Sequence, residues 1–334
     1  MNELPFVTVV IAAYNSERTI EKCLTCLIEQ DYPQDKFEVI IVDDGSIDNT
    51  AKIIRFFEDR YENIKYIKIS SNTGWSNAER VGMNKAKGEF IALTNSDYYV
   101  PKNWITGLIN NFTYSDIAGV GGGYVHVGDW VNFSLNTFFL EKKTQTNFLG
   151  AYNSCFQKKI IDKIGAMDET IMAEDVDLSI RLILAGYKLI HDPTIIVEHD
   201  HPLNSFFNLT KKKLLYAKYQ IQVFKKHNFP PLFSKKFIIA SIFSLLYLIT
   251  IAILGYICKF PKIITATLFM LPVFSIIIGE IYVCKKLVTE HKKYLKKYNL
   301  KIPFIKMVLV RSFSTSMQTF MKFIYYFYYK YIVR

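Results

Sequence analysis

The chain has 334 residues, of which 50% are hydrophobic and 21% are charged, and this composition excludes a disordered or fibrous protein. Its net charge of +11 is concentrated in residues 201–334, where 22 basic residues stand against two acidic ones, Glu280 and Glu290. The acidic first 200 residues do not offer the basic face that a nucleic acid needs, so no nucleic-acid partner is expected. The basic and apolar remainder suits membrane lipids with anionic headgroups.

Short apolar runs alternate with helical patterns along the first 125 residues. The apolar, β-branched runs predict buried strands over residues 6–12, 37–42, 64–69, 90–94 and 118–125. Capping residues and apolar periodicity predict helices over residues 16–30, 49–57, 75–86 and 102–112. This alternation predicts an α/β fold, in which a mostly parallel sheet is flanked by helices on both faces. Such sheets bind ligands at the carboxyl ends of their strands.

The pattern of residues 126–200 is less regular. It predicts a strand over residues 150–156, a helix over 158–164 and a second helix over 175–185, which Gly186 ends. A last β-branched strand over residues 195–197 leads to His199.

The character of the sequence changes after residue 204. Residues 209–226 place lysines on one side of an amphipathic pattern, as in a helix that lies on a bilayer. Residues 237–258 carry no charge and residues 263–284 carry one, so each run is long enough to cross a membrane. The link between them is very short, which favours a hairpin of two transmembrane helices over a buried helix pair of a soluble protein.

We therefore expect four segments. An α/β domain over residues 1–204 is followed by an interfacial helix and linker over 205–236 and by a membrane hairpin over 237–284. A basic linker and an interfacial or third membrane helix complete the chain over 285–334. Lysines flank both ends of the hairpin, and positively charged flanks remain on the cytoplasmic side. The prediction is a multi-pass protein of the cell membrane with its α/β domain in the cytoplasm.

Acidic residues follow two of the predicted strands directly. Asp43 and Asp44 come after the second strand, where carboxylates can accept hydrogen bonds from a ribose or a base. A turn with a capping aspartate explains this pair equally well. Asn95 and Asp97 follow the fourth strand, and two oxygen ligands there suit Mg²⁺ or Mn²⁺ that also binds phosphate oxygens. A simple loop turn remains the alternative for this second pair.

A third acidic cluster, Glu174 and Asp175, opens a predicted helix. Acids at a helix start interact favourably with its dipole, which is the structural interpretation. The functional interpretation is a general base, because deprotonating a hydroxyl requires a carboxylate within hydrogen-bond reach. His199 closes a strand and could be a third metal ligand, with His201 as a spare, although a single histidine is more often structural.

Taken in order, these motifs resemble those of the family 2 glycosyltransferases, which have the GT-A fold. The resemblance covers about residues 5–202 and rests on six segments in the expected order: Val7 to Asn15, Val39 to Ser46, Asn72 to Gly74, Asn95 to Asp97, Glu174 to Asp177, and His199. It implies an inverting transfer of a sugar from a nucleotide-diphosphate sugar. The acceptor that the membrane segments suggest is lipid-linked, and a soluble glycan is the alternative.

The resemblance also assigns roles to residues. Ala12 and Tyr14 would lie against the nucleobase, and Asp44, with Asp43, would bind base and ribose. Asn95 and Asp97 occupy the positions of the family's metal-binding motif, for which His199 would complete the set of ligands.

On the acceptor side, Asp175 matches the general base and Glu174 stands beside it. The segment from Gly150 to Asn153 aligns with the strand that lines the acceptor.

The sequence departs from the family pattern at three places. Asn95 replaces the first acid of the metal motif, which predicts weaker metal binding. Ala78-Glu79-Arg80 stands where the family usually has Ala-Arg-Asn, so a phosphate role for Arg80 is an open question. The Gln-x-x-Arg-Trp signature of processive synthases is absent, which favours the addition of one sugar per encounter.

Two other functions compete with this interpretation. A nucleotide-dependent oxidoreductase would need a glycine-rich turn after the first strand, and the chain has Ala12-Ala-Tyr-Asn-Ser there instead. A membrane-tethered protein that binds a nucleotide sugar without catalysis is favoured by Asn95 and opposed by the intact Glu174-Asp175 pair.

Overall fold

The computed structural model describes residues 3–127, 142–168, 170–171 and 173–200, and a few isolated positions between 219 and 281. The chain divides into two compact units, one of Met1–Asp129 and Asn136–Pro202 and one of Trp130–Leu135 and Leu203–Arg334. The second unit lies almost wholly outside the described residues, and so do the predicted segments 205–236, 237–284 and 285–334. Within the described part of the chain, no helix has the length and apolar character that crossing a membrane requires.

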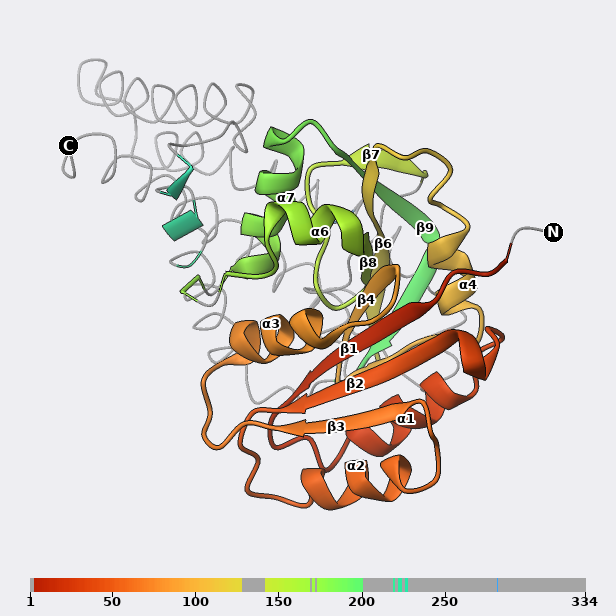
Figure 1. Ribbon diagram of the computed structural model, residues 1–334, viewed down its shortest axis with the longest axis vertical. Helices are drawn as coiled ribbons and strands as arrows, with labels where there is room; N and C mark the ends of the chain where they lie inside the picture. Colours follow the sequence, from red (N-terminus) through yellow and green to blue (C-terminus); the bar gives the residue numbers. More distant parts are fainter. Residues whose placement is uncertain are drawn as a thin grey trace, which may run out of the picture. The chain divides into compact units, whose positions relative to one another are not determined.

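The first unit is built on one sheet with helices on both faces (Figure 1). Its strands, in chain order, are β1 (Val7–Ala13), β2 (Phe37–Asp43), β3 (Ile64–Lys68), β4 (Phe90–Asn95), β5 (Tyr98–Tyr99), β6 (Ile117–His126), β7 (Thr144–Thr146), β8 (Ser154–Gln157) and β9 (Lys188–His199). Its helices are α1 (Ile20–Ile28), α2 (Thr50–Glu58), α3 (Trp75–Lys85), α4 (Trp104–Ile109), α6 (Lys158–Ile164) and α7 (Glu174–Leu184), with a short 3₁₀ helix η1 (Gln34–Lys36) before β2.

The order of strands across the sheet is β3-β2-β1-β4-β8-β6-β9-β5, with β7 paired to β9. The four strands β3, β2, β1 and β4 are parallel, as are β6 and β9, whereas β8 runs antiparallel to both of its neighbours. Ala12 is in register with Val42 on one side and with Asn95 on the other. The carboxyl ends of β1, β2 and β4 therefore meet at one edge, where the sequence places Asp43 and Asp44 at the end of β2 and Asn95 and Asp97 at the end of β4.

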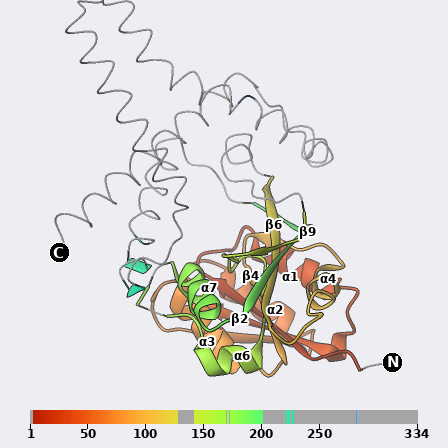
Figure 2. The ribbon, with the colours of Figure 1, turned by 90° about the horizontal axis from the view of Figure 1, so that it is seen from above.

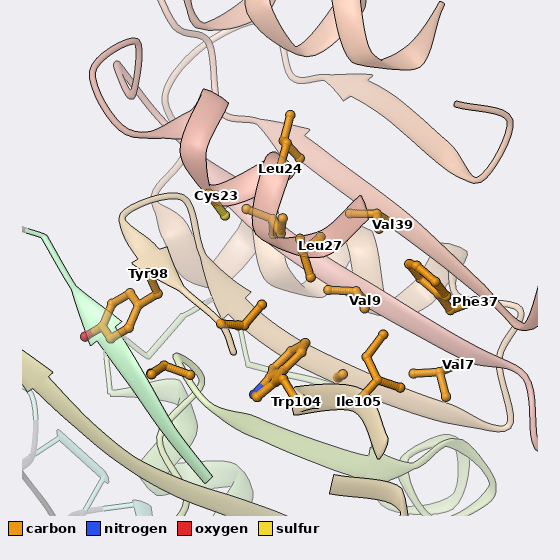
Figure 3. Close-up of a cluster of buried hydrophobic side chains, with 14 of the residues drawn as sticks. Val7, Val9, Cys23, Leu24, Leu27, Phe37, Val39, Tyr98, Trp104 and Ile105 are labelled. Atoms are coloured by element: carbon orange, nitrogen blue, oxygen red, sulfur yellow. The ribbon is translucent and has the colours of Figure 1, made fainter. Parts of the chain in front are cut away.

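Alternate residues of β1 point to opposite faces of the sheet, as the two-residue period of a strand requires. Val9 and Ile11 belong to a core that β1 and β2 share with α1, α2 and α4, and Figure 3 shows part of it. Val10 belongs to the core on the other face, with side chains of α3, α6 and α7. Figure 2 shows the sheet between these two helical layers. The predicted α/β fold with both faces covered is thereby confirmed.

Two strands differ from their predicted limits by more than one residue, and the short strands β5 and β7 were not predicted. The strand expected over residues 150–156 begins only at Ser154, after a turn in which the Asn153 amide donates to the Gly150 carbonyl at 3.3 Å. The strand expected over residues 195–197 is the end of the 12-residue β9. Its length follows from its pairing with β6, which extends to the register pair His126 and His199. Long-range pairing of this kind leaves no local signal in the sequence.

Candidate active site

The loops after β1 and β2 are held together at the carboxyl edge of the sheet. Asn15 has a left-handed backbone, with φ of 47°, which asparagine tolerates better than most residues. Its amide donates to Ser46 Oγ at 2.9 Å, and its Oδ1 accepts from the Ile47 amide at 3.0 Å. Tyr14, just before this turn, is 46% exposed, and Ala12 is half-buried at the end of β1. These two residues thus lie at the edge where a nucleobase was predicted.

Asp43 and Asp44 are buried, and both carboxylates accept hydrogen bonds from the protein. Asp43 accepts from the Ser46 amide at 2.8 Å and from Tyr66 Oη at 2.7 Å. Asp44 holds the loop before α3, because it accepts from the Thr73 amide and hydroxyl, both at 2.8 Å, and from the Gly74 amide at 2.7 Å.

Hydrogen bonds of this kind are typical of aspartates that stabilise a turn, so they agree with the interpretation of Asp43 and Asp44 as turn residues. A carboxylate has about four lone-pair positions, and a ribose or base would have to use those that remain. Binding of the nucleotide by Asp43 and Asp44 stays a prediction.

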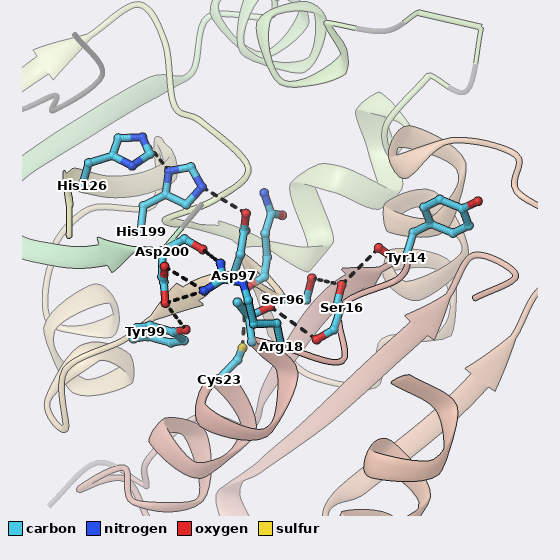
Figure 4. Close-up of polar contacts among 12 residues, drawn as sticks. Tyr14, Ser16, Arg18, Cys23, Ser96, Asp97, Tyr99, His126, His199 and Asp200 are labelled. Atoms are coloured by element: carbon cyan, nitrogen blue, oxygen red, sulfur yellow. Dashed lines mark hydrogen bonds and ion pairs between the residues drawn. The ribbon is translucent and has the colours of Figure 1, made fainter. Parts of the chain in front are cut away.

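Three side chains line up beyond β4, and they come from the turn between β4 and β5, from the end of β6 and from the end of β9. The Nε2 atom of His199 lies 3.1 Å from Asp97 Oδ2, and its Nδ1 atom lies 2.9 Å from His126 Nε2 (Figure 4). The ring of Tyr98 stacks on the His199 ring, with 4.0 Å between the centroids. The structure therefore joins Asp97 to His199, which are 102 positions apart in the sequence. It adds His126, which the sequence analysis did not identify.

The residue after His199 fixes the end of β9. Arg18 Nη1 donates to both carboxylate oxygens of Asp200 at 3.2 Å, and Arg18 Nη2 donates to the backbone carbonyl of Asp200 at 2.8 Å. Tyr99 Oη donates to the same carboxylate at 3.0 Å, and the Asp200 amide donates to the Asp97 carbonyl at 2.9 Å (Figure 4). These bonds attach β9 to β5 and to the start of α1. They hold His199 beside Asp97.

The donors at this point suit a divalent cation. Asp97 offers carboxylate oxygen and His199 an imidazole nitrogen, a combination that fits Mn²⁺. Asn95, the last residue of β4, is half-buried two positions before Asp97. No group of three or more His, Cys, Asp or Glu side chains suited to a metal gathers anywhere in the described residues. The few protein ligands are consistent with a cation that takes its other ligands from phosphates and water.

The third acidic cluster lies at the first turn of α7. Glu174 is buried and accepts a hydrogen bond from Trp75 Nε1 at 2.9 Å, whereas Asp175 is partly exposed and accepts from the Val176 amide at 2.8 Å. Burial raises the pKa of Asp175 to about 6. Burial, and then the charge of Asp175, raise the pKa of Glu174 to about 8. Burial thus moves the pKa of both carboxyl groups toward neutral pH.

A third carboxyl group, that of Glu79 on α3, interacts electrostatically with this pair. Its side chain is buried, and burial followed by the charges of Glu174 and Asp175 raises the pKa of Glu79 well above its usual value. The only trace of Glu79 in the sequence is its departure from the family's Ala-Arg-Asn pattern. Asp177, by contrast, forms an ion pair with Arg181 at 2.8 Å and belongs to the structure of α7.

The two residues predicted on the acceptor side lie in the turn before β8. Gly150 is buried within this turn. The Asn153 side chain is buried and bonds to Trp104 Nε1 at 2.8 Å, and to the carbonyls of Gly123 and Ile195 at 2.8 and 3.0 Å. Asn153 thus joins α4, β6 and β9, and its side chain is directed to the core rather than to the cluster at Asp175.

Comparison with known protein families gives two matches. The model described as "Glycosyl transferase family 2" matches residues 8–165, and the model described as "Glycosyl transferase family group 2" matches residues 95–281. Together the matched ranges include Asp43 and Asp44, Asn95 and Asp97, and the cluster at the start of α7.

Two curated proteins illustrate the similarity. Glycosyltransferase AglE of Haloferax volcanii is 29% identical over 228 residues, which are 66% of this chain and 74% of AglE. Poly-beta-1,6-N-acetyl-D-glucosamine synthase of Staphylococcus aureus is 26% identical over 206 residues, which are 58% of this chain and 49% of the synthase. The chain thus spans about three quarters of the first relative and about half of the second.

Solved structures share the fold. The mannosyltransferase PcManGT of Pyrobaculum calidifontis, in complex with GDP-Man and Mn²⁺, has a TM-score of 0.63 and 17% identity, and the match covers 96% of this chain and 88% of PcManGT. TarS 1–349 of S. aureus, in complex with UDP-GlcNAc, has a TM-score of 0.51 and 21% identity, with 64% and 66% covered. At these identities the likeness shows the α/β fold of GT-A type.

Proposed function

The chain belongs to glycosyltransferase family 2, and from that premise we propose that it is an inverting enzyme with Asp175 as its general base. It moves a sugar from a nucleotide-diphosphate donor to a hydroxyl of a lipid-linked or glycan acceptor, one sugar per encounter. The observation that carries this proposal is the acidic cluster at the first turn of α7, in which Asp175 is partly exposed and Glu174 is buried and hydrogen-bonded to Trp75.

The role of Asp175 follows from the chemistry of inversion. The acceptor hydroxyl attacks the anomeric carbon as the bond to the nucleoside diphosphate breaks, and the hydroxyl proton passes to a carboxylate. A base acts best when its pKa lies near the working pH, and the raised pKa of Asp175 meets that condition. Glu174 is held by Trp75 and positions the first turn of α7.

The donor occupies the carboxyl edge of β1, β2 and β4 in this proposal. Tyr14 and Ala12 contact the base, and Asp43 and Asp44 provide their remaining acceptor positions to the base and ribose. Support comes from the exposure of Tyr14 and from the location of the four residues at one edge of the sheet.

Asp97, His199 and Asn95 hold Mg²⁺ or Mn²⁺ in this proposal. When bound, the cation offsets the negative charge on the diphosphate leaving group. The 3.1 Å contact between Asp97 and His199 supports this assignment, and Asn95 supplies a neutral oxygen where the family has a second acid.

The location of the enzyme is proposed from the sequence of residues 205–334. An amphipathic stretch and an apolar hairpin with lysine flanks place the catalytic domain on the cytoplasmic side of the cell membrane, next to membrane lipids. In a variant of the protein whose native cysteines are replaced, Phe260→Cys in the hairpin link should react with an impermeant thiol reagent in intact cells. Lys52→Cys on α2 should react only after lysis, and labelling of Lys52→Cys in intact cells would reverse the proposed orientation.

Activity is tested by a panel of nucleotide sugars, including GDP-Man and UDP-GlcNAc. The full chain in membranes should release nucleoside diphosphate from one of them when acceptor is present, with Mn²⁺ and Mg²⁺ compared against EDTA. Asp162→Asn on the exposed side of α6 is the control for Asp175→Asn. Tight donor binding without turnover in the wild type would instead favour a nucleotide-sugar-binding protein that has lost catalysis.

A further inference from the structure

His126 lies beside His199 on the neighbouring strand. β6 and β9 run parallel, and the two histidines are register partners at the ends of these strands. Register partners direct their side chains to the same face of a sheet, so the two rings come together. Nε2 of His126 lies 2.9 Å from Nδ1 of His199, and Nε2 of His199 lies 3.1 Å from Asp97 Oδ2 (Figure 4). The three side chains thus form a row with His199 in the middle.

Exposure to solvent increases along this row. His126 is 2% exposed, whereas the side chains of His199 and Asp97 are 12% and 25% exposed. The two outer side chains can therefore meet a ligand that arrives from solvent, and His126 supports them from inside the domain.

Aromatic packing fixes the plane of the His199 ring but not which of its edges faces Asp97. Tyr98 stacks on the ring, with 8° between the two planes, and Tyr124 meets both histidine rings edge-on, at 5.6 and 5.8 Å between centroids. A half-turn of His199 about its Cβ–Cγ bond would keep this plane and exchange the nitrogen atoms with carbon atoms. The hydrogen bond to His126 is lost in that half-turn, so it favours the orientation that presents Nε2 to Asp97.

The same hydrogen bond also favours one tautomer. A neutral imidazole has one N–H and one lone pair, so its two nitrogens have opposite roles. When Nε2 of His199 offers its lone pair to a cation, Nδ1 carries the proton and donates it to Nε2 of His126. Histidines that bind metals usually donate their other N–H to a protein group in this way, and loss of that group weakens metal binding.

We propose that His126 is a positioning residue for His199, which it holds in the orientation and tautomer that present Nε2 to a divalent cation beside Asp97. The inference rests on the proposed role of Asp97 and His199 as metal ligands. His126 itself does not touch the cation.

Two substitutions at His126 separate the hydrogen bond from the packing of the ring. His126→Gln places an amide near the position of Nε2, and the amide oxygen can accept from Nδ1 of His199. His126→Leu fills a similar space and has no polar atom. Because both changes remove the aromatic ring, a difference between them reports the hydrogen bond alone.

The affinity of the full chain for Mn²⁺ is the first readout, measured from the paramagnetic resonance signal of the free ion during titration with Mn²⁺ alone. His126→Leu should weaken binding about tenfold or more, and His126→Gln should remain within about threefold of the wild type. The matched control is His191→Leu, which removes a buried imidazole near the start of β9 and should bind as the wild type does. Equal affinities for His126→Leu and His126→Gln, or an equal loss in His191→Leu, would overturn the positioning role.

Pulsed paramagnetic resonance of the bound Mn²⁺ is the second readout, because it detects the nitrogen of a coordinated imidazole. The wild type and His126→Gln should show this nitrogen coupling, His199→Phe should lack it, and His126→Leu should show it weakened or lost. A coupling as strong in His126→Leu as in the wild type would refute the inference and leave His199 as a ligand. A wild type without nitrogen coupling would instead refute the proposed ligand role of His199, and the inference with it.

Discussion

The carboxylates on the donor side, Asp43 and Asp44, differ from those beside the proposed base, Asp175, in the number of hydrogen bonds that they accept. On the donor side, Asp44 accepts three hydrogen bonds from the loop before α3 and Asp43 accepts two, and these bonds shape the loops around the carboxyl edge of the sheet. On the base side, Glu79 and Glu174 are buried, each with one oxygen that has no hydrogen-bond partner among the described residues, and the pKa of Asp175 is raised by burial.

This difference distinguishes two uses of acidic residues in one domain. A carboxylate surrounded by N–H and O–H donors is stabilised in its charged form and serves as a structural anchor. A buried carboxyl group without such donors retains or takes up a proton near neutral pH, which is what proton transfer requires. Sequence motifs give no indication of which use applies, because both sites appear as short acidic clusters beside a strand or helix end.

The largest expected effect comes from removing the base. Asp175→Asn keeps the size of the side chain but cannot accept the acceptor proton, so turnover should fall by about 10² or more. Donor binding, measured by calorimetry with the same nucleotide sugar, should be nearly unchanged. Turnover within about twofold of the wild type would remove Asp175 from the mechanism.

The metal site is expected to respond next most strongly. Asp97→Ala removes the carboxylate that contacts His199 and should abolish the part of the activity that depends on a divalent cation. Asn95→Asp adds a second carboxylate and should raise the affinity for Mn²⁺, which is measured by titration of the protein with the ion. Full activity of the wild type in excess EDTA would contradict both expectations.

On the donor side, Asp44→Asn should affect stability before chemistry. An amide can accept through one oxygen only, so the Thr73 and Gly74 donors lose part of their acceptor, and the cost is about 1–3 kcal/mol. The midpoint of denaturant unfolding should fall accordingly, and the KM for the donor should rise as the loop before α3 loosens. An unchanged midpoint would mean that Asp44 does not anchor this loop.

A smaller effect is expected in the dependence of stability on pH. The folded protein raises the pKa of Glu174 to about 8, so it binds a proton that the unfolded chain releases from about pH 4.5 upward. The corresponding stabilisation is full below that pH and is lost as the pH rises toward about 8. Glu174→Gln should flatten this part of the curve of unfolding free energy against pH, and a curve that is identical to that of the wild type would contradict the raised pKa.

The elements of the first unit could be predicted from the sequence because their signals are local. The buried runs of β1, β2 and β4 and the periodicity of α3 and α7 are each contained in a dozen residues or fewer. The acidic pairs could be placed at one edge because parallel strands that alternate with helices bring their carboxyl ends together.

Short segments of sequence do not specify the register between paired strands or the contacts between helices that are distant in the chain. His126 meets His199 because β6 and β9 are parallel with a shifted register near Gly121 and Gly123, and no short segment specifies that shift. Trp75 donates to Glu174 across 99 positions of sequence, because the start of α3 lies beside the start of α7. Both contacts depend on tertiary packing, as does the withdrawal of Asn153 into the core.

The most direct test of the central claim is the pH profile of kcat/KM for the wild type and for Asp175→Asn. The wild-type profile should rise through an acidic limb near pH 6, where Asp175 ionises. This limb should be absent from the residual activity of Asp175→Asn. A limb at the same pH in both proteins would show that another group takes the proton and would contradict the assignment of Asp175 as the base.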